Sequence, residues 1–274
     1  MQSEIQIHGH RGCRGYYPEN TLKGFKKALQ LGSTAVELDV VVSKDKRLVV
    51  SHEPYMNHLF CLKPDGSKIT QDTEADFNFF EMKLAHIQEF DCGYRTDEKY
   101  PQQLQIKEHK PSLEEVVSAL PADTFFNIEV KSEQQWYEIY QPDVKTYAKL
   151  VANFIEEHLL YNRCLVQSFD PRFLNAFKEL VNDKVVIGYL VEYNLNPVEQ
   201  LNNLHFKPEY FNPDFTLLTD EHLAYLKSKQ IKTLVWTVNE LTDIQKMISL
   251  GVDGIISDYP DRVVEVLKNK KGGI

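Results

Sequence analysis

The sequence predicts an α/β fold and, within that class, a TIM-type (β/α)8 barrel with an inserted subdomain after the third strand. Apolar, β-rich runs alternate with amphipathic helical patterns along the chain, which is typical of a parallel sheet with crossover helices. The length of 274 residues is usual for one barrel, and 42% hydrophobic and 26% charged residues are typical of a globular protein with a large core. We therefore expect a single barrel domain, residues 1–274.

Nine segments have the composition of strands, one more than the eight places of a barrel, so one should be a short flanking piece. In chain order they are Ile5–His8, Ala35–Val42, Leu48–Ser51, Thr124–Lys131, Cys164–Ser168, Val185–Leu190, Glu209–Phe211, Lys232–Val238 and Gly254–Ser257. Continuous apolar runs within them, such as Val40-Val41-Val42, indicate strands that are buried on both faces.

Apolar residues spaced three and four positions apart predict helices between these strands. The first such stripe begins at Leu22 and stops before Gly32, and a longer one runs from Val144 to His158. Another stripe follows Pro171. A further one ends at Gly251, where glycine suits a helix C-terminus.

The alternation is interrupted between about residues 53 and 110, where turn signals and scattered aromatic residues replace it. Regularity resumes at Ser112, which has capping-box spacing to Glu115. An interruption this long exceeds an ordinary loop, and segments after a barrel strand lie over the active-site face. We expect a lid or substrate-selecting insert in which aromatic residues such as Phe79 and Tyr94 form a pocket or a cover. Simple padding of that face is the alternative.

The four cysteines, Cys13, Cys61, Cys92 and Cys164, have neither C-x-x-C nor zinc-ligand spacing. Scattered cysteines of this kind are typical of free thiols in a reducing compartment, and that is the expectation. A Cys61–Cys92 bridge within the insert is the alternative.

Charge and hydropathy exclude several classes of partner. The formal net charge of −9 argues against nucleic acid or an anionic membrane as the main partner. No run approaches the roughly 18 apolar residues of a membrane helix, so stable membrane insertion is not expected. The first residues, Met1 to Ile5, lack the basic and apolar regions of a secretory signal. As the sequence stands we expect a cytoplasmic protein, or a periplasmic or secreted one if a leader was removed.

Two histidines and an arginine lie at the ends of predicted strands. His10 and Arg11 follow the first strand, and His52 follows the third. Histidine is suited to give and to take a proton near neutral pH, and arginine presents a planar fork to phosphate oxygens. We predict that His10 and His52 form an acid/base pair and that Arg11 binds phosphate. Taken alone, His10 could instead be a structural histidine in the core, and Arg11 could form a surface ion pair.

Three carboxylates lie in apolar strands. Glu37 and Asp39 point to the same face because they are two residues apart, and Glu129 shares a face with Lys131 in the same way. Buried carboxylates must be paired or hold a metal, and ligands that are all oxygen suit Mg²⁺ or Ca²⁺ better than zinc. We predict one divalent cation held by the three acids, with Lys131 neutralising phosphate. Ion pairing within the barrel is the alternative.

A series of short motifs resembles the glycerophosphodiester phosphodiesterase family. The matching pieces are H-R-G at 10–12, P-E-N-T at 18–21, E-L-D-V at 37–40, S-K-D-K-R-L-V-V-S-H at 43–52, N-I-E-V-K at 127–131, Q-S-F-D at 167–170, V-W-T-V-N at 235–239 and D-G-I-I-S-D-Y-P at 253–260. The resemblance implies a TIM-type barrel that hydrolyses glycerophosphodiesters, as small-molecule substrates, to an alcohol and sn-glycerol 3-phosphate with Mg²⁺ or Ca²⁺.

The same resemblance implies a role for each candidate residue. It implies that His10 and His52 are the general acid and base, that Glu37, Asp39 and Glu129 are metal ligands, that Arg11 and Lys131 stabilise phosphate, and that Trp236 is the pocket aromatic. From its position late in a predicted strand alone, core packing of Trp236 is an equal alternative.

One departure and two other functions stay open. The family's third-strand motif usually reads His-Asp, whereas here it is His52-Glu53, so we expect an altered hydrogen bond to His52 with unaltered chemistry. A phospholipase-like phosphodiesterase that acts on lipid head groups is one alternative, although the sequence has no strong apolar or basic docking element. A catalytically silent barrel that serves as a binding protein is the other, and the complete set of polar residues argues against it.

Overall fold

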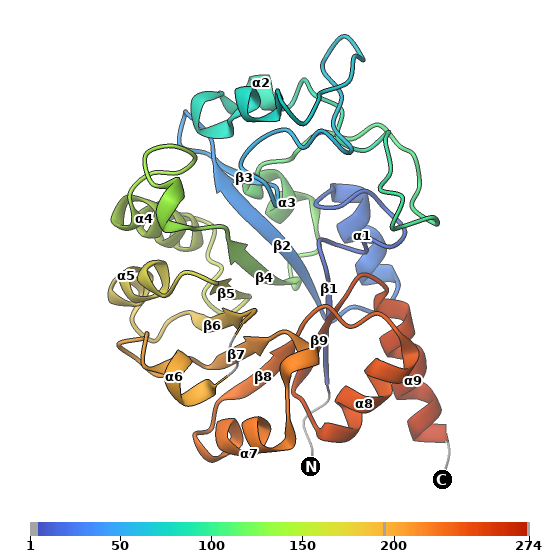
Figure 1. The fold of residues 1–274 in the computed structure, drawn as a ribbon, viewed down its shortest axis with the longest axis vertical. Coiled ribbons are helices and arrows are strands. Elements are labelled where there is room, and N and C mark those ends of the chain that lie inside the picture. Colours follow the sequence, from blue (N-terminus) through green and yellow to red (C-terminus); the bar gives the residue numbers. More distant parts are fainter. Residues whose placement is uncertain (1–4, 194–195, 273–274) are drawn as a thin grey trace.

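The computed structural model describes residues 5–193 and 196–272, and its strands close into the expected barrel (Figure 1). Eight parallel strands form the ring, namely β1 (Gln6–Gly9), β2 (Ala35–Val42), β4 (Phe125–Val130), β5 (Cys164–Ser168), β6 (Val186–Val191), β7 (Tyr210–Pro213), β8 (Lys232–Val235) and β9 (Gly254–Ser257). The ring closes because β1 pairs with both β2 and β9. The predicted fold class is confirmed.

The ninth strand, β3 (Leu48–Val50), lies outside the ring and pairs antiparallel with β2. After β2 the chain turns and runs back along it, so that the Ser51 N–H donates to the Asp39 carbonyl at 3.0 Å. The flanking piece is therefore the strand before the insert, and the expectation that the insert follows a barrel strand is wrong in this respect. This return path is also what carries His52 to the level of Asp39.

Helices surround the ring in chain order (Figure 1). They are α1 (Leu22–Gln30), α3 (Leu113–Ala119), α4 (Val144–Glu157), α5 (Pro171–Val181), α6 (Pro197–Leu201), α7 (Asp220–Ser228), α8 (Leu241–Leu250) and α9 (Pro260–Gly272). The predicted caps are present, since Ser112 and Glu115 form a capping box on α3 and Gly251 ends α8 with φ 80°. In the part of the chain that the structure describes, no helix has the length and apolarity needed to cross a membrane.

The inside of the ring is apolar at the N-terminal ends of its strands and polar at their C-terminal ends. Leu165, Tyr210, Leu234 and Ile256 form a small cluster there that is separate from the main core between strands and helices. The next inward-facing positions along these strands are nearer the C-terminal ends, and several of them carry polar side chains, such as Gln167 and Asn212. In a TIM-type barrel this is the face where catalytic residues gather.

The insert, residues 53–110, lies beside β2 and β3 at the upper edge of Figure 1. It contains two 3₁₀ turns (Glu74–Phe77 and Phe79–Glu81) and the short α2 (Leu84–Ile87). A separate apolar core holds it together and packs on Val41 and Val49; its other members are Met56, Cys61, Ile69, Phe79, Met82, Ile87, Phe90 and Cys92. Phe79 is therefore a core residue of the insert.

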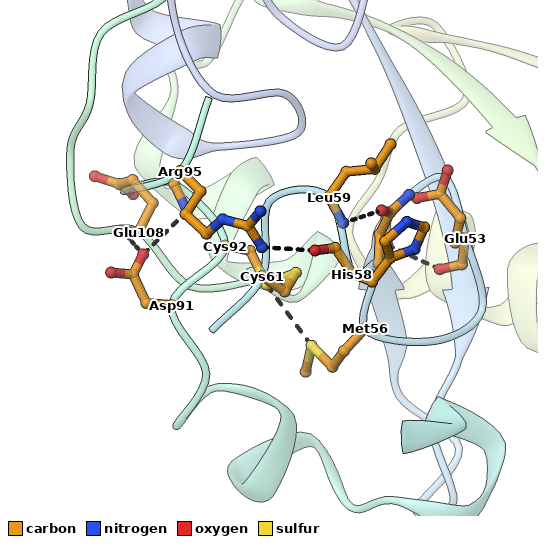
Figure 2. The surroundings of a disulfide bond; sticks show 12 residues. Glu53, Met56, His58, Leu59, Cys61, Asp91, Cys92, Arg95 and Glu108 are labelled. Carbon is orange, nitrogen blue, oxygen red and sulfur yellow. Dashed lines mark hydrogen bonds between the residues drawn. A yellow bond between two sulfur atoms is a disulfide. The ribbon is translucent and has the colours of Figure 1, made fainter. Parts of the chain in front are cut away.

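A disulfide bond joins Cys61 and Cys92 inside this small core (Figure 2). Leu62 and Asp91 exchange two backbone hydrogen bonds of 2.7 and 3.1 Å, and this pairing brings their cysteine neighbours together. The expectation of free thiols is thus wrong for these two residues, because spacing along the chain does not show that the two segments meet. The other two cysteines, Cys13 and Cys164, are free and buried.

Candidate active site

The predicted site residues converge on one pocket of about 800 Å³ at the C-terminal ends of the barrel strands. Those that line it are His10, Arg11, Glu37, His52, Glu129, Lys131 and Trp236. Asp39 completes the set because one of its oxygens lies within 4.8 Å of ligand atoms of both Glu37 and Glu129. Residues that are more than a hundred positions apart in the chain therefore share one site.

The three carboxylates form a buried cluster that is suited to a hard cation. Asp39 lies directly opposite Glu129 in the pairing of β2 with β4, and Glu37 is one pleat below Asp39. All three are less than a tenth exposed. Glu37 Oε1 and Asp39 Oδ1 are buried without a hydrogen-bond partner. Oxygen atoms left unsatisfied in this way are free to bind a cation such as Mg²⁺ or Ca²⁺.

The electrostatics of the cluster favour the same interpretation. Burial, with the neighbouring Asp39 and Glu129 carboxylates, raises the pKa of Glu37 well above its ordinary value. A cation at this place would remove that repulsion and keep Glu37 ionised. Asp39 differs, because the Arg11 guanidinium at 3.2 Å and the Asn20 amide at 2.8 Å outweigh its burial and lower its pKa.

Arg11 is held by the backbone as well as by its side chain. Its φ of 49° lies in the left-handed region, and its N–H donates to Glu37 Oε2 at 2.8 Å. The following Gly12 has φ 92°, and a Cβ there would lie 2.8 Å from the Gly24 carbonyl carbon, so this turn requires glycine. The Arg11 guanidinium donates to Glu19 Oε2 at 2.8 Å. The turn thus fixes a cation beside the acidic cluster.

His10 is oriented by a buried carboxylate. Its Nδ1 lies 2.7 Å from Asp258 Oδ1, and β9, which pairs with β1, places Asp258 there. Burial and the nearby Arg14 and Arg11 cations lower the pKa of His10 to about 4, although Asp258 opposes the shift. His10 is therefore neutral at pH 7, and with its Nδ1–H donating to Asp258 its Nε2 is free to accept a proton.

His52 has a carboxylate partner of its own. Its Nδ1 lies 2.9 Å from Glu53 Oε1, so the residue that departs from the family motif does bond to this histidine. Burial opposes ionisation of Glu53, but its hydrogen bond with His52 and the buried Lys110 cation lower its pKa to about 2. Glu53 is thus an ionised acceptor that orients the His52 ring.

Lys131 and Trp236 form the remaining walls near the acids. Lys131 Nζ donates to Glu129 Oε1 at 2.6 Å. Trp236 Nε1 donates to the Asn212 carbonyl at 2.8 Å, and its ring meets that of Phe169 edge-on at 5.4 Å. Trp236 is partly exposed; it lines the pocket and also packs against the small apolar cluster inside the ring.

Comparison with known proteins identifies the family to which this arrangement belongs. The family model described as the glycerophosphoryl diester phosphodiesterase family matches residues 10–262. The chain belongs to this family. It is 30% identical to a glycerophosphodiester phosphodiesterase of Bacillus altitudinis, over 97% of this chain and 99% of that protein. It is 29% identical to one of Caldanaerobacter subterraneus, over 96% of this chain and 97% of that protein.

A solved structure agrees with the fold of this family member. The crystal structure of a putative glycerophosphoryl diester phosphodiesterase from Silicibacter pomeroyi matches with a TM-score of 0.89 at 26% identity. The match covers 98% of this chain and 95% of that one, so it includes the insert as well as the barrel.

The outer wall of the pocket in this family member differs from the expectation. The loops after β4, β5, β6 and β8 supply it, with Glu133, Trp136, Phe169, Glu192 and Tyr193 among its residues. Residues 54–110, all of which the structure describes, contribute none of the lining. The expectation that Phe79 and Tyr94 form the substrate pocket is therefore wrong: Phe79 is buried in the insert, and Tyr94 is exposed away from the lining.

Several supporting residues were not predicted as parts of the site. Glu19 binds Arg11, Asn20 binds Asp39, and Asp258 binds His10. All three lie within motifs that carried the family resemblance, P-E-N-T and S-D-Y-P, but no role was assigned to them. Asp258 directly follows a predicted strand, and a polar residue at that place in a barrel is a signal for the active-site face.

Proposed function

We propose that this protein hydrolyses glycerophosphodiesters to an alcohol and sn-glycerol 3-phosphate, with one divalent cation and two histidines. The observation that carries the proposal is the meeting, in one pocket, of two carboxylate-oriented histidines with a buried triad of acids. A base, an acid and positive charge near phosphorus are what cleavage of a phosphodiester requires. Membership of the glycerophosphoryl diester phosphodiesterase family supports the same substrate class.

Glu37, Asp39 and Glu129 would hold the cation, since their oxygens are buried, close together and in part unsatisfied. When bound, Mg²⁺ or Ca²⁺ supplies positive charge that polarises a phosphoryl oxygen. Arg11 and Lys131 add fixed positive charge on either side of the acids. In a buried pocket, such fixed donors stabilise developing negative charge without reorganisation.

The two histidines are suited to different proton transfers. Neutral His10, whose Nδ1 faces Asp258, is placed to accept a proton from the attacking oxygen. We assign the donation of a proton to the departing alcohol to His52, because the ionised Glu53 carboxylate holds its ring. The attacking oxygen is that of water or of the glycerol 2-hydroxyl, and the second route passes through a cyclic phosphate.

The proposal is tested by measuring glycerol 3-phosphate release from water-soluble glycerophosphodiesters, with His10→Ala and His52→Ala as variants. Each variant should lose on the order of 10²–10⁴-fold in kcat while remaining folded. Release from intact phospholipid in preference to the soluble diesters would support a phospholipase instead. Failure of the folded wild type to cleave any diester would support a binding protein.

A further inference from the structure

After β4 the chain stays extended past Lys131 to a second acid, Glu133. Inward residues alternate along this strand, and Glu129 and Lys131 are followed at the same spacing by Glu133. Glu133 lines the pocket from the loop that follows β4, together with its neighbour Ser132. Two residues of extended chain span roughly 6.6 Å, so Glu133 lies about one pleat farther out than the phosphate-binding lysine.

An acid also lines the pocket just beyond β6, the strand on the other side of β5. Its inward position Leu190 is followed two residues later by Glu192, and both line the pocket. The register of the three strands sets the height of these residues, because Gln167 of β5 is opposite both Glu129 of β4 and Gly188 of β6. Glu133 and Glu192 are each four residues beyond these partners, in the loops that follow β4 and β6, so the two acids enter the pocket from either side of β5.

Aromatic rings lie between and around the two acids. Phe169, which follows β5, has Trp236 against its edge at 5.4 Å, and Trp136 lines the pocket from the loop after β4. Rings of this kind attract cations to their faces, tryptophan most strongly, and such groups recognise quaternary ammonium ligands. Lys131 already illustrates this, since its Nζ lies 5.7 Å from the centre of the Phe169 ring.

The charges of the pocket are separated along its depth. At its inner end Lys131 is paired with Glu129, and Arg14 is paired with Asp258 and Glu19. At its outer end, neither Glu133 nor Glu192 forms an ion pair with any residue in the ranges that the structure describes. The inner end, where phosphate would bind, thus combines fixed cations with the acids that would hold a divalent ion, whereas the outer end has two acids and aromatic walls.

We propose that this outer end, formed by Glu133, Glu192, Trp136, Phe169 and Trp236, binds an ammonium group, and that the preferred substrates are glycerophosphodiesters of cationic amino alcohols. The inference rests on the proposed function for the chemical step and adds the class of the leaving alcohol. A zwitterionic diester, with its phosphate inside and its ammonium group outside, matches the separation of charge. The two acids and the rings are specificity-determining residues and take no part in proton transfer.

The kinetic test compares glycerophosphocholine and glycerophosphoethanolamine with the neutral glycerophosphoglycerol. Removing both acids in a Glu133→Gln/Glu192→Gln variant should lower kcat/KM for the two cationic diesters by about tenfold, which is within the range for charge and cation–π contacts. For glycerophosphoglycerol the change should be within about twofold. The control for net charge is Glu156→Gln/Glu157→Gln, which removes two exposed acids at the end of α4 and should alter kcat/KM for none of the three diesters. Equal losses on all three diesters, or no loss on the cationic ones, would overturn the inference.

A binding measurement gives a second readout that needs no catalysis. Both tryptophans of the chain, Trp136 and Trp236, line this pocket, so intrinsic fluorescence reports its occupancy. Choline should change the fluorescence at a concentration at least about tenfold below that of its uncharged analogue 3,3-dimethylbutan-1-ol, and the double glutamine variant should abolish this difference. Equal affinity for the two compounds would overturn the inference. If the wild type discriminated between them but cleaved no diester, the ammonium site would stand and the proposed function would fail.

Discussion

Replacing Asp258 by Asn removes the charge that orients His10 and leaves a side chain of nearly the same shape. Asp258 Oδ1 lies 2.7 Å from His10 Nδ1, and its side chain is almost fully buried. The same carboxylate also accepts from Arg14 at 3.0 Å and from Asn239 at 2.8 Å, so it is itself firmly held. The substitution therefore tests the orientation and the charge environment of one histidine with little change in packing.

The magnitude follows from the type of bond that is lost. A hydrogen bond to a charged group contributes about 1.5–3 kcal/mol, which corresponds to roughly 10–150-fold in kcat/KM if the bond matters in the transition state. The pH profile should change too. Asp258 favours protonated His10, whose pKa of about 4 already lies below its ordinary value, so Asp258→Asn should lower it further. In the proposed mechanism neutral His10 is the active form, so the acid limb of the pH profile should move to lower pH.

The assay is kcat/KM for a soluble glycerophosphodiester between pH 3 and pH 8, with the free energy of unfolding measured in parallel at each pH. Tyr100→Phe is the control, because the Tyr100 hydroxyl bonds to Asp258 Oδ2 at 3.3 Å without contacting His10; it should cost no more than about threefold. A folded Asp258→Asn enzyme with near wild-type kcat/KM would refute the role given to this pair. So would an acid limb that moves to higher pH.

Three further predictions follow from the site and the insert. Glu37→Gln removes one charge from the buried cluster and should weaken Mg²⁺ or Ca²⁺ binding by at least about tenfold, as calorimetric titration would show; unchanged affinity would exclude Glu37 as a ligand. A nitrophenyl diester, whose leaving group hardly needs a proton, should partly rescue His52→Ala but not His10→Ala, and the reverse pattern would exchange their roles. Loss of the Cys61–Cys92 bond, with a sequence separation of 31, should cost about 3–4 kcal/mol of unfolding free energy without changing kcat; equal stability in Cys61→Ser would contradict this.

The architecture was predictable because it depends on local patterns. Buried runs such as Val40-Val41-Val42 and helix signals such as the Ser112–Glu115 box are visible within a few residues, and all nine predicted strands are present. The direction of β3 was not visible, because antiparallel pairing with β2 depends on a turn and not on composition. The disulfide was missed for a related reason, since it depends on two insert segments that pair through Leu62 and Asp91.

For the candidate site, too, some residues could be proposed from the sequence and others could not. The acids could be proposed because a charged residue in an apolar strand needs a partner or a ligand. The histidines could be proposed because they follow predicted strands, whose C-terminal ends form the active-site face of a barrel. Glu19 and Asp258 could not, because each acts through another residue and its role appears only once Arg11 and His10 are in place. The pocket wall was assigned to the insert, whereas the loops after β4, β5, β6 and β8 form it. Which loop reaches over a barrel depends on its packing, and four phenylalanines of the insert pack into the insert's own core, namely Phe60, Phe77, Phe79 and Phe90.

The most direct test of the central claim is the rate of glycerol 3-phosphate release from glycerophosphocholine after chelation and stepwise return of metal. We predict no release in excess EDTA, full recovery with Mg²⁺ or Ca²⁺, and no recovery at any metal concentration in a folded His10→Ala/His52→Ala variant. Undiminished release in EDTA, or metal-restored release by the double variant, would contradict a mechanism in which the buried acids hold a cation and the two histidines move the protons.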